Sequence, residues 1–176
     1  MNILDIIKNN KKEIIISNIV IFYMTMCYNL PLFLNLYFNI EPCKINLDFI
    51  DSKIPFIKFF VIFYVYYYLH IYLSTICIGL LNKEAFYKYI SSSIISCTIG
   101  GFILLIFPTY FEFNNEIYSN NSCFDFIFKL LNTAKLQYNA FPSFHIIKTY
   151  IIFRYLYYLL KQKYLKILLI IITILI

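Results

Sequence analysis

The sequence has no tryptophan, a single arginine (Arg154), three glycines and few charged residues. Only 14% of its residues are charged, whereas soluble domains carry roughly 25%. This shortage of charge excludes a soluble globular domain, and the shortage of glycine excludes a collagen-like repeat. The hydrophobic fraction of 61% excludes a disordered chain. At 176 residues, the chain is also too long for a small secreted domain held together by disulfides.

Long apolar runs are what the sequence has instead. Three runs of 27, 24 and 23 residues contain no Asp, Glu, Lys or Arg. About 20 helical residues cross a hydrocarbon core of about 30 Å, and a backbone in lipid must satisfy its own hydrogen bonds. The sequence therefore predicts membrane-spanning helices over residues 14–39, 59–81 and 89–111.

The rest of the chain is less uniform. Residues 112–142 are mixed in polarity and form a predicted outer segment, with a short interfacial or re-entrant helix at about 124–131. A fourth span is predicted at 143–160, and it contains Lys148 and Arg154. The last ten residues, 167–176, are apolar, but ten helical residues rise only about 15 Å. They are either an interfacial tail or, as we prefer, half of a fifth span in a chain truncated relative to its relatives.

The predicted fold class is therefore all-α. We expect one membrane domain over residues 1–176, a polytopic helical bundle of four full transmembrane helices plus a half-length fifth. The short interfacial helix precedes the fourth span.

The lysines predict the orientation of this bundle. Basic residues concentrate in cytoplasmic loops, and a cytoplasmic N-terminus places eight lysines inside and five outside. We therefore expect an integral protein of the plasma (inner) membrane, with residues 112–142 outside the cytoplasm. Inner lysines that meet anionic headgroups account for the net charge of +6, so no nucleic-acid partner is needed. The inner lysines are Lys8, Lys11, Lys12, Lys83, Lys88, Lys161, Lys163 and Lys166.

Cysteine and histidine give few further signals. No Cys/His spacing indicates a metal site, and no cofactor is predicted. Cys43 and Cys123 both fall in outer segments, where a disulfide is permitted but not required. His70 lies within the second predicted span among tyrosines; it is either a functional intramembrane group or a histidine that neighbouring hydroxyls satisfy.

Small residues in the third predicted span form a packing face. Ser93, Cys97 and Gly101 recur at four-residue spacing, as do Ser92, Ser96 and Gly100. Small residues at this spacing let the backbones of two membrane helices approach closely. The pattern predicts a tight helix–helix contact and carries no information about function.

Residues 139–145, Asn-Ala-Phe-Pro-Ser-Phe-His, carry the strongest chemical signal. Pro142 is suited to open the fourth helix, and the first N–H groups of a helix bind anions, phosphate above all. The Ser143 hydroxyl joins these N–H groups, and His145 in the first turn can donate a proton to the anion. Lys148 either adds positive charge or extends outward. The alternative is a capped helix start with an ordinary histidine.

This segment resembles the Pro-Ser-x-His motif of the type 2 phosphatidic acid phosphatase superfamily, near the branch of inositol phosphorylceramide synthases. Two further stretches are similar: Asp-x-x-Ile-Pro-Phe-Ile at 51–57, and Phe-Pro-Thr at 107–109 after the third span. The resemblance implies an all-helical membrane fold that acts on lipid phosphates at the outer face through a phosphohistidine. It also implies that His145 is the general acid and that Ser143 contacts the phosphate.

The chain also departs from the family pattern. The Arg-Pro that usually follows Phe-Pro-Thr is missing, and the third motif, with the nucleophilic histidine, is absent. Whether the chain is an enzyme therefore stays open. It is either a lipid phosphatase or phosphotransferase that is inactive in this truncated form, or a degenerate protein that binds lipid phosphate or a membrane partner. The third alternative is an unrelated membrane protein with a chance match. The expected partners are membrane lipids, and the oligomeric state is not predicted.

Overall fold

The computed structural model describes residues 10–45, 53, 58–111, 127 and 138–176. Its main elements are five α-helices, one 3₁₀ helix and two short strands. The interfacial helix predicted at 124–131 lies outside the described residues except for residue 127, and Cys123 lies outside them as well. In chain order the elements are α2 (Lys11–Tyr37), β1 (Cys43–Lys44), η1 (Lys58–Phe60), α4 (Val61–Leu81), α5 (Lys83–Ile106), β2 (Thr109–Tyr110), α7 (Phe144–Leu159) and α8 (Lys163–Leu175).

Three of these helices are long and apolar enough to cross a membrane: α2, α4 and α5. They coincide with the three predicted spans, so the structure confirms an all-helical fold with three candidate membrane helices. The helix α7 has 16 residues and a length of about 24 Å, which is shorter than a hydrocarbon core of about 30 Å. The helix α8 has 13 residues. The predicted set of four full spans plus a half span is therefore not confirmed.

The boundaries of the third span were predicted six residues too late at its start and five too late at its end. Asn82 alone separates α4 from α5; its backbone is extended and its side chain accepts a hydrogen bond from the Ala85 N–H at 2.8 Å. This cap starts α5 at once, so Lys83 and Lys88 lie in the first turns of the helix rather than in a loop. At the other end, Pro108 cannot donate to the helix, which ends at Ile106.

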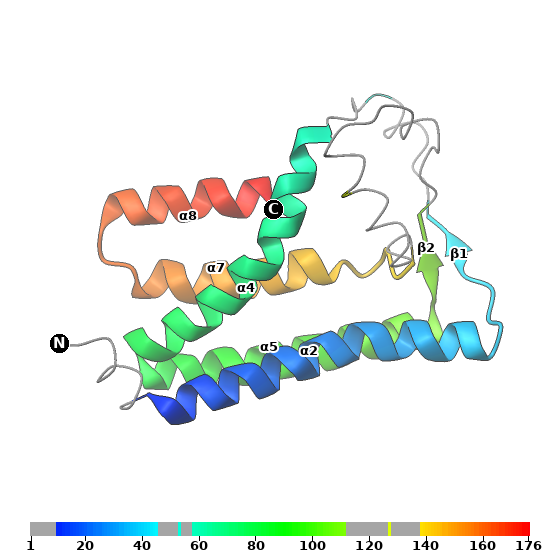
Figure 1. The fold of residues 1–176 in the computed structure, drawn as a ribbon, viewed down its shortest axis with the longest axis horizontal. Coiled ribbons are helices and arrows are strands. Elements are labelled where there is room, and N and C mark those ends of the chain that lie inside the picture. Colours follow the sequence, from blue (N-terminus) through cyan, green and yellow to red (C-terminus); the bar gives the residue numbers. More distant parts are fainter. Residues whose placement is uncertain (1–9, 46–52, 54–57, 112–126, 128–137) are drawn as a thin grey trace.

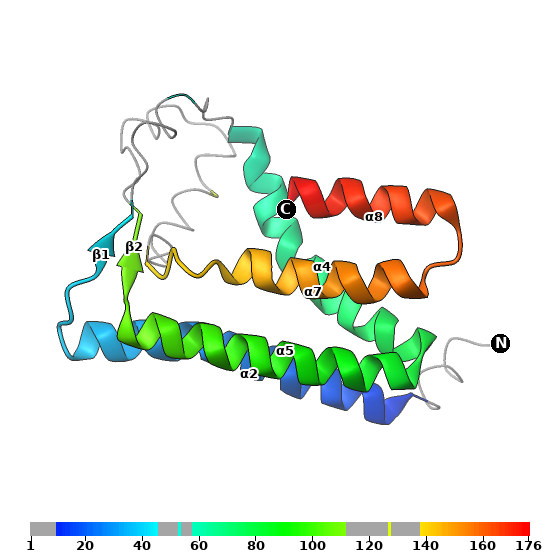
Figure 2. The same cartoon turned by 180° about the vertical axis from the view of Figure 1, so that it is seen from behind.

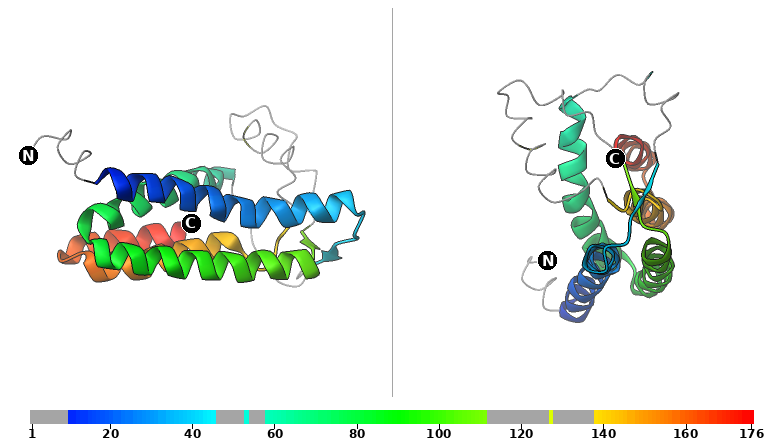
Figure 3. Two further views of the ribbon diagram at one scale, coloured as in Figure 1. Left: turned by 90° about the horizontal axis from the view of Figure 1, so that it is seen from below. Right: turned by 90° about the vertical axis from the view of Figure 1, so that its right-hand side faces the viewer.

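Successive long helices run in alternating directions (Figure 1). The helices α2 and α5 lie side by side along most of their lengths, and α7 packs on α5 and α4 (Figures 1 and 3). The helix α4 crosses the others obliquely, and α8 folds back along α7 (Figure 2).

The bundle has two chemically different ends. One, which we call the lysine end, holds the starts of α2 and α5 and the connection from α7 to α8 (Figure 1). The opposite, strand end holds β1 and β2, and the segment that leads into α7 runs inward from it (Figure 1). The described lysines of the lysine end are Lys11, Lys12, Lys83, Lys88, Lys161, Lys163 and Lys166. The sequence predicted that these lysines lie on one side of the bundle.

The predicted small-residue face of α5 is buried. Ser93, Cys97 and Gly101 are all buried, and a Cβ added to Gly101 would lie 2.6 Å from the Cys27 carbonyl oxygen of α2. A Cβ on Gly100 would lie 2.9 Å from the Phe144 ring of α7. The prediction of a tight helix–helix contact is therefore confirmed, with α2 and α7 as the two partners.

A short sheet joins the chain at the strand end. Strands β1 and β2 pair in parallel, with Cys43 opposite Thr109 and Lys44 opposite Tyr110. Tyr110 also forms an antiparallel bridge with Tyr138. These pairings hold the segment that precedes α7 against the ends of α2 and α5.

Candidate functional site at the start of α7

Hydrogen bonds fix the segment that leads into α7. The Asn139 N–H donates to the Thr109 carbonyl at 2.7 Å, and the Asn139 side-chain amide donates to the Tyr28 carbonyl at 2.9 Å. The Thr109 hydroxyl accepts from the Phe141 N–H at 2.9 Å and donates to the Phe141 carbonyl at 3.1 Å. The Phe-Pro-Thr and Asn-Ala-Phe-Pro-Ser stretches, which the sequence singled out separately, are thus in direct contact.

Ser143 is the N-cap of α7. Its backbone is extended and its hydroxyl accepts from the Ile146 N–H at 3.5 Å. The prediction that Pro142 occupies the first helical turn was wrong, because the helix begins two residues later, at Phe144. The Ser143 carbonyl accepts from the Ile147 N–H at 3.1 Å. The first N–H groups of the helix, those of Phe144 and His145, have no acceptor inside the helix and carry the positive end of its dipole.

The imidazole of His145 lies among tyrosine rings of α4. Its centroid is 4.1 Å from the ring of Tyr67, 4.7 Å from Tyr64 and 6.4 Å from Tyr68. The Nε2 atom of His145 is buried and has no hydrogen-bond partner among the described residues. A buried polar atom without a partner is unusual in native proteins and marks His145 as a candidate functional residue.

Lys148 is buried one turn further along α7, at 8% exposure. Its Nζ lies 5.4 Å from the centroid of the Phe144 ring. The side chain thus turns back toward the start of the helix, as helical geometry favours, and does not extend outward to solvent. Within the described part of the chain, ion pairs join Lys83 to Glu13 and Lys88 to Glu84, and neither includes Lys148.

The structure thus places Ser143, His145 and Lys148 on the first turns of one helix. Ser143 caps the helix, His145 faces α4, and Lys148 folds over Phe144. The Phe144 ring packs edge-on against Tyr28 of α2, at 5.5 Å between centroids, and against Gly100 of α5. The site therefore lies where α2, α4 and α5 meet the start of α7.

The tyrosines of α4 were assigned to the wrong histidine. The sequence suggested that they surround His70, but Tyr64, Tyr67 and Tyr68 contact His145. Among the described aromatic residues, Tyr66 is the one whose ring lies near His70, at 5.9 Å between centroids. Positions 64, 67 and 68 share one helix face at spacings of three and four. This spacing is the signal that could have found the cluster. His70 Nδ1 lies 3.4 Å from the Ser74 hydroxyl, which supplies the expected neighbouring hydroxyl.

Comparison of the chain with family models, with curated proteins and with solved structures finds no match. Across the described residues, no group of three or more His, Cys, Asp or Glu side chains could hold a metal ion. Cys43 is an exposed free thiol. The chemistry available at the start of α7 is therefore that of its own side chains: a hydroxyl, an imidazole, an ammonium and free backbone N–H groups.

Proposed function

We propose that this chain is an integral membrane protein that holds the phosphate group of a lipid at the start of α7 and does not turn it over. The observation that carries the proposal is the burial of the Lys148 side chain. This lysine is buried at 8% exposure and has no carboxylate partner among the described residues. A charged group inside a membrane bundle is costly and marks a functional site by default. An anion is the natural complement.

The surrounding groups favour phosphate as that anion. The free N–H groups at the start of α7 and the Ser143 hydroxyl are hydrogen-bond donors to an anion, and the helix dipole adds positive potential. The buried His145 Nε2 is available as a further donor when it carries a proton. Because the exposed side chains of α2, α4 and α5 are largely apolar, the surrounding solvent is lipid and the phosphate is that of a lipid headgroup.

The lysines support an orientation with the site outside the cytoplasm. The lysine end gathers seven described lysines, and basic residues favour the cytoplasmic side. The start of α7 lies away from the lysine end and faces the strand end of the bundle (Figure 1). We therefore assign the site to the extracytoplasmic face of the plasma membrane, with the N-terminus in the cytoplasm.

The proposal excludes turnover because no second histidine lies at the site to act as the nucleophile. The chain has two histidines, and the ring contacts of His145 do not include His70, which contacts Tyr66 of its own helix. Tyr110 and Phe111 follow Thr109 where the resembling family usually has Arg-Pro. The loss of a single oxyanion contact typically costs about 10²–10³ in rate, and the loss of a nucleophile costs more.

Lipid phosphatase or phosphotransferase activity is the second candidate. One observation favours it: Thr109 and Phe141 are hydrogen-bonded to each other. These hydrogen bonds bring together the Phe-Pro-Thr and Asn-Ala-Phe-Pro-Ser stretches, both of which resemble motifs of the phosphatase superfamily. Phosphate release from a lipid substrate distinguishes this candidate from binding alone.

Lipid binding by the purified chain tests the proposal. Native mass spectrometry of the full chain with equal amounts of phosphatidic acid and phosphatidylcholine measures which lipid is retained. We expect the wild-type chain to prefer phosphatidic acid. In Lys148→Met the preference should be about tenfold smaller, because hydrogen bonds to charged groups contribute about 1.5–3 kcal/mol. Lys88→Met, which removes an exposed lysine at the lysine end, is the matched control and should keep the preference.

Stability separates a binding role of Lys148 from a structural one. Replacing an unpaired buried charge by an apolar side chain of similar size is neutral or stabilising. Lys148→Met should therefore unfold at the same temperature as the wild type or a higher one. Equal retention of both lipids by the wild type, or unchanged preference in Lys148→Met, contradicts the proposal.

A further inference from the structure

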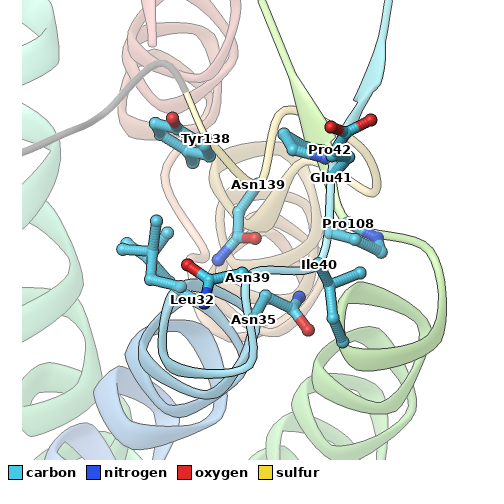
Figure 4. A pocket seen from close by; sticks show the side chains of 10 residues that line it. Leu32, Asn35, Asn39, Ile40, Glu41, Pro42, Pro108, Tyr138 and Asn139 are labelled. Carbon is cyan, nitrogen blue, oxygen red and sulfur yellow. The ribbon is translucent and has the colours of Figure 1, made fainter.

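A cavity of about 330 Å³ opens at the strand end, between the last turns of α2 and the segment before α7 (Figure 4). It has apolar walls and a polar set made of three asparagines, a glutamate and a tyrosine. Neither His145 nor Lys148 lines it, so it is separate from the proposed phosphate site. Its described lining residues are Leu32, Asn35, Leu36, Asn39, Ile40, Glu41, Pro42, Pro108, Tyr138 and Asn139.

The two buried asparagines of the cavity use their NH₂ groups on backbone carbonyls. Asn35, 4% exposed, donates to the Leu104 carbonyl at 2.9 Å. In a helix that carbonyl would accept from residue 108, but Pro108 has no N–H, and Asn35 replaces it. Asn139, 5% exposed, donates to the Tyr28 carbonyl at 2.9 Å. Because carbonyls only accept, each amide must present its nitrogen to them, which fixes the orientation of both side chains.

The amide oxygen of each side chain therefore points away from its carbonyl partner. Asn35 Oδ1 is buried and has no hydrogen-bond partner within the described part of the chain. Glu41 adds a carboxylate and is the one charged residue among the described lining residues. The carboxylate lies beside Pro42 at the edge of the group of lining side chains (Figure 4). The cavity thus offers hydrogen-bond acceptors and negative charge, and it disfavours an anion.

The backbone around the cavity is unusual as well. Asn39 and Asn139, with φ of 52° and 58°, are the non-glycine residues with positive φ in the described ranges, and both line the cavity. Asparagine tolerates this left-handed conformation better than most residues. Sparsely populated backbone conformations cluster at ligand sites, where the surrounding structure holds them in place.

We propose that this cavity binds a primary ammonium group. An ammonium has three N–H donors and a positive charge, which match the acceptors and the carboxylate of the lining. A polyol matches this lining less well because it carries no charge to pair with Glu41, whereas an ammonium can donate to Asn35 Oδ1 and pair with the carboxylate. The ammonium can belong to a free alkylamine or to an aminoethyl lipid headgroup, and Leu32, Leu36 and Ile40 supply apolar contacts to either.

Competition between two lipids tests this inference on the full chain. Phosphatidylethanolamine and phosphatidylcholine with the same acyl chains differ in their N–H donors, since the trimethylated headgroup has none. Native mass spectrometry should show that the wild type retains phosphatidylethanolamine about fivefold better, as expected for roughly 1 kcal/mol of charge-assisted bonding. Glu41→Gln removes the negative charge, keeps the side-chain shape and should abolish the preference. Because Glu41 is exposed, we expect the variant to fold as the wild type does. Glu84→Gln, an exposed glutamate at the lysine end, should keep it.

Competition with free ethanolamine and with metal cations identifies the source of the ammonium. If free ethanolamine displaces the lipid, the cavity recognises the ammonium alone; if it does not, the ammonium is recognised as part of the headgroup, and both results support the inference. Displacement by sodium or calcium at the same concentration identifies a general cation site and overturns it. Equal retention of the two lipids by the wild type, or an unchanged preference in Glu41→Gln, also overturns it.

Discussion

A Cβ atom on Gly101 would lie 2.6 Å from the carbonyl oxygen of Cys27, so α5 touches the backbone of α2 at this point. Pro31, four residues after Cys27, has no N–H and leaves that carbonyl without its helical donor. The proline in α2 and the glycine in α5 therefore act together. Pro31 leaves the Cys27 carbonyl without its helical donor, and Gly101, which has no side chain, lets α5 pack directly over that carbonyl.

Gly101→Ala should destabilise the bundle. The added methyl group meets backbone rather than a flexible side chain, so α2 and α5 must separate, and overpacking of this kind costs about 1–3 kcal/mol. Thermal unfolding in detergent measures the loss. Ser91→Ala, at an exposed position of the same helix, is the control and should leave the midpoint unchanged. An equal midpoint for Gly101→Ala and the wild type would show that the two helices pack differently.

Asn35 and Pro108 should be energetically coupled. Asn35→Leu leaves the Leu104 carbonyl buried without a donor, which costs about 1–3 kcal/mol. Pro108→Ala restores an N–H at the position that a helix would use, so it should recover part of the loss in the Asn35→Leu background. A double-mutant cycle on unfolding free energies measures this coupling. Additive effects of the two substitutions would exclude the compensation.

Two ion pairs at the lysine end should differ in strength. Lys83 Nζ lies 3.1 Å from Glu13, whose side chain is 5% exposed, whereas Lys88 and Glu84, at 2.6 Å, are both largely exposed. Lys83→Met leaves a buried carboxylate unpaired and should cost more than Lys88→Met, for which about 0.5 kcal/mol or less is expected of an exposed i,i+4 pair. Unfolding midpoints of the two variants provide the comparison. Equal losses would place Glu13 in contact with water.

Cys43 is a natural reporter of orientation. It is a free, exposed cysteine at the strand end, and we expect a membrane-impermeant maleimide to label it in intact cells. The test uses the Cys123→Ser background, because Cys123 is predicted on the same side, and in that background Cys43→Ser should abolish this labelling. A cysteine introduced at Lys163 of the lysine end should react only after the membrane is opened. The reverse pattern would invert the orientation.

The amino-acid sequence predicts the three long helices because each lies in a long run without charged residues, which favours a membrane span. In lipid the backbone must satisfy its own hydrogen bonds, and a helix does so. The sequence analysis misplaces the ends of α5 because single residues determine where this helix begins and ends. Asn82 caps its start, and Pro108 follows its last residues. The cluster around His145 was missed because α4 and α7 contact each other across more than 70 residues of sequence. The cavity was missed for a similar reason, since Asn35 and its partner Leu104 are 69 residues apart. Such contacts depend on how the helices pack, which periodicity does not specify.

The ³¹P NMR spectrum of phosphatidic acid in nanodiscs that contain the full chain tests the central claim most directly. We predict that the wild-type chain broadens or shifts the phosphate resonance and that no inorganic phosphate signal grows with time. In Lys148→Met the resonance should return to that of empty nanodiscs, whereas Lys88→Met should behave as the wild type. Identical spectra with and without the chain would contradict binding at the start of α7. Growth of an inorganic phosphate signal that His145→Ala abolishes would contradict the absence of turnover.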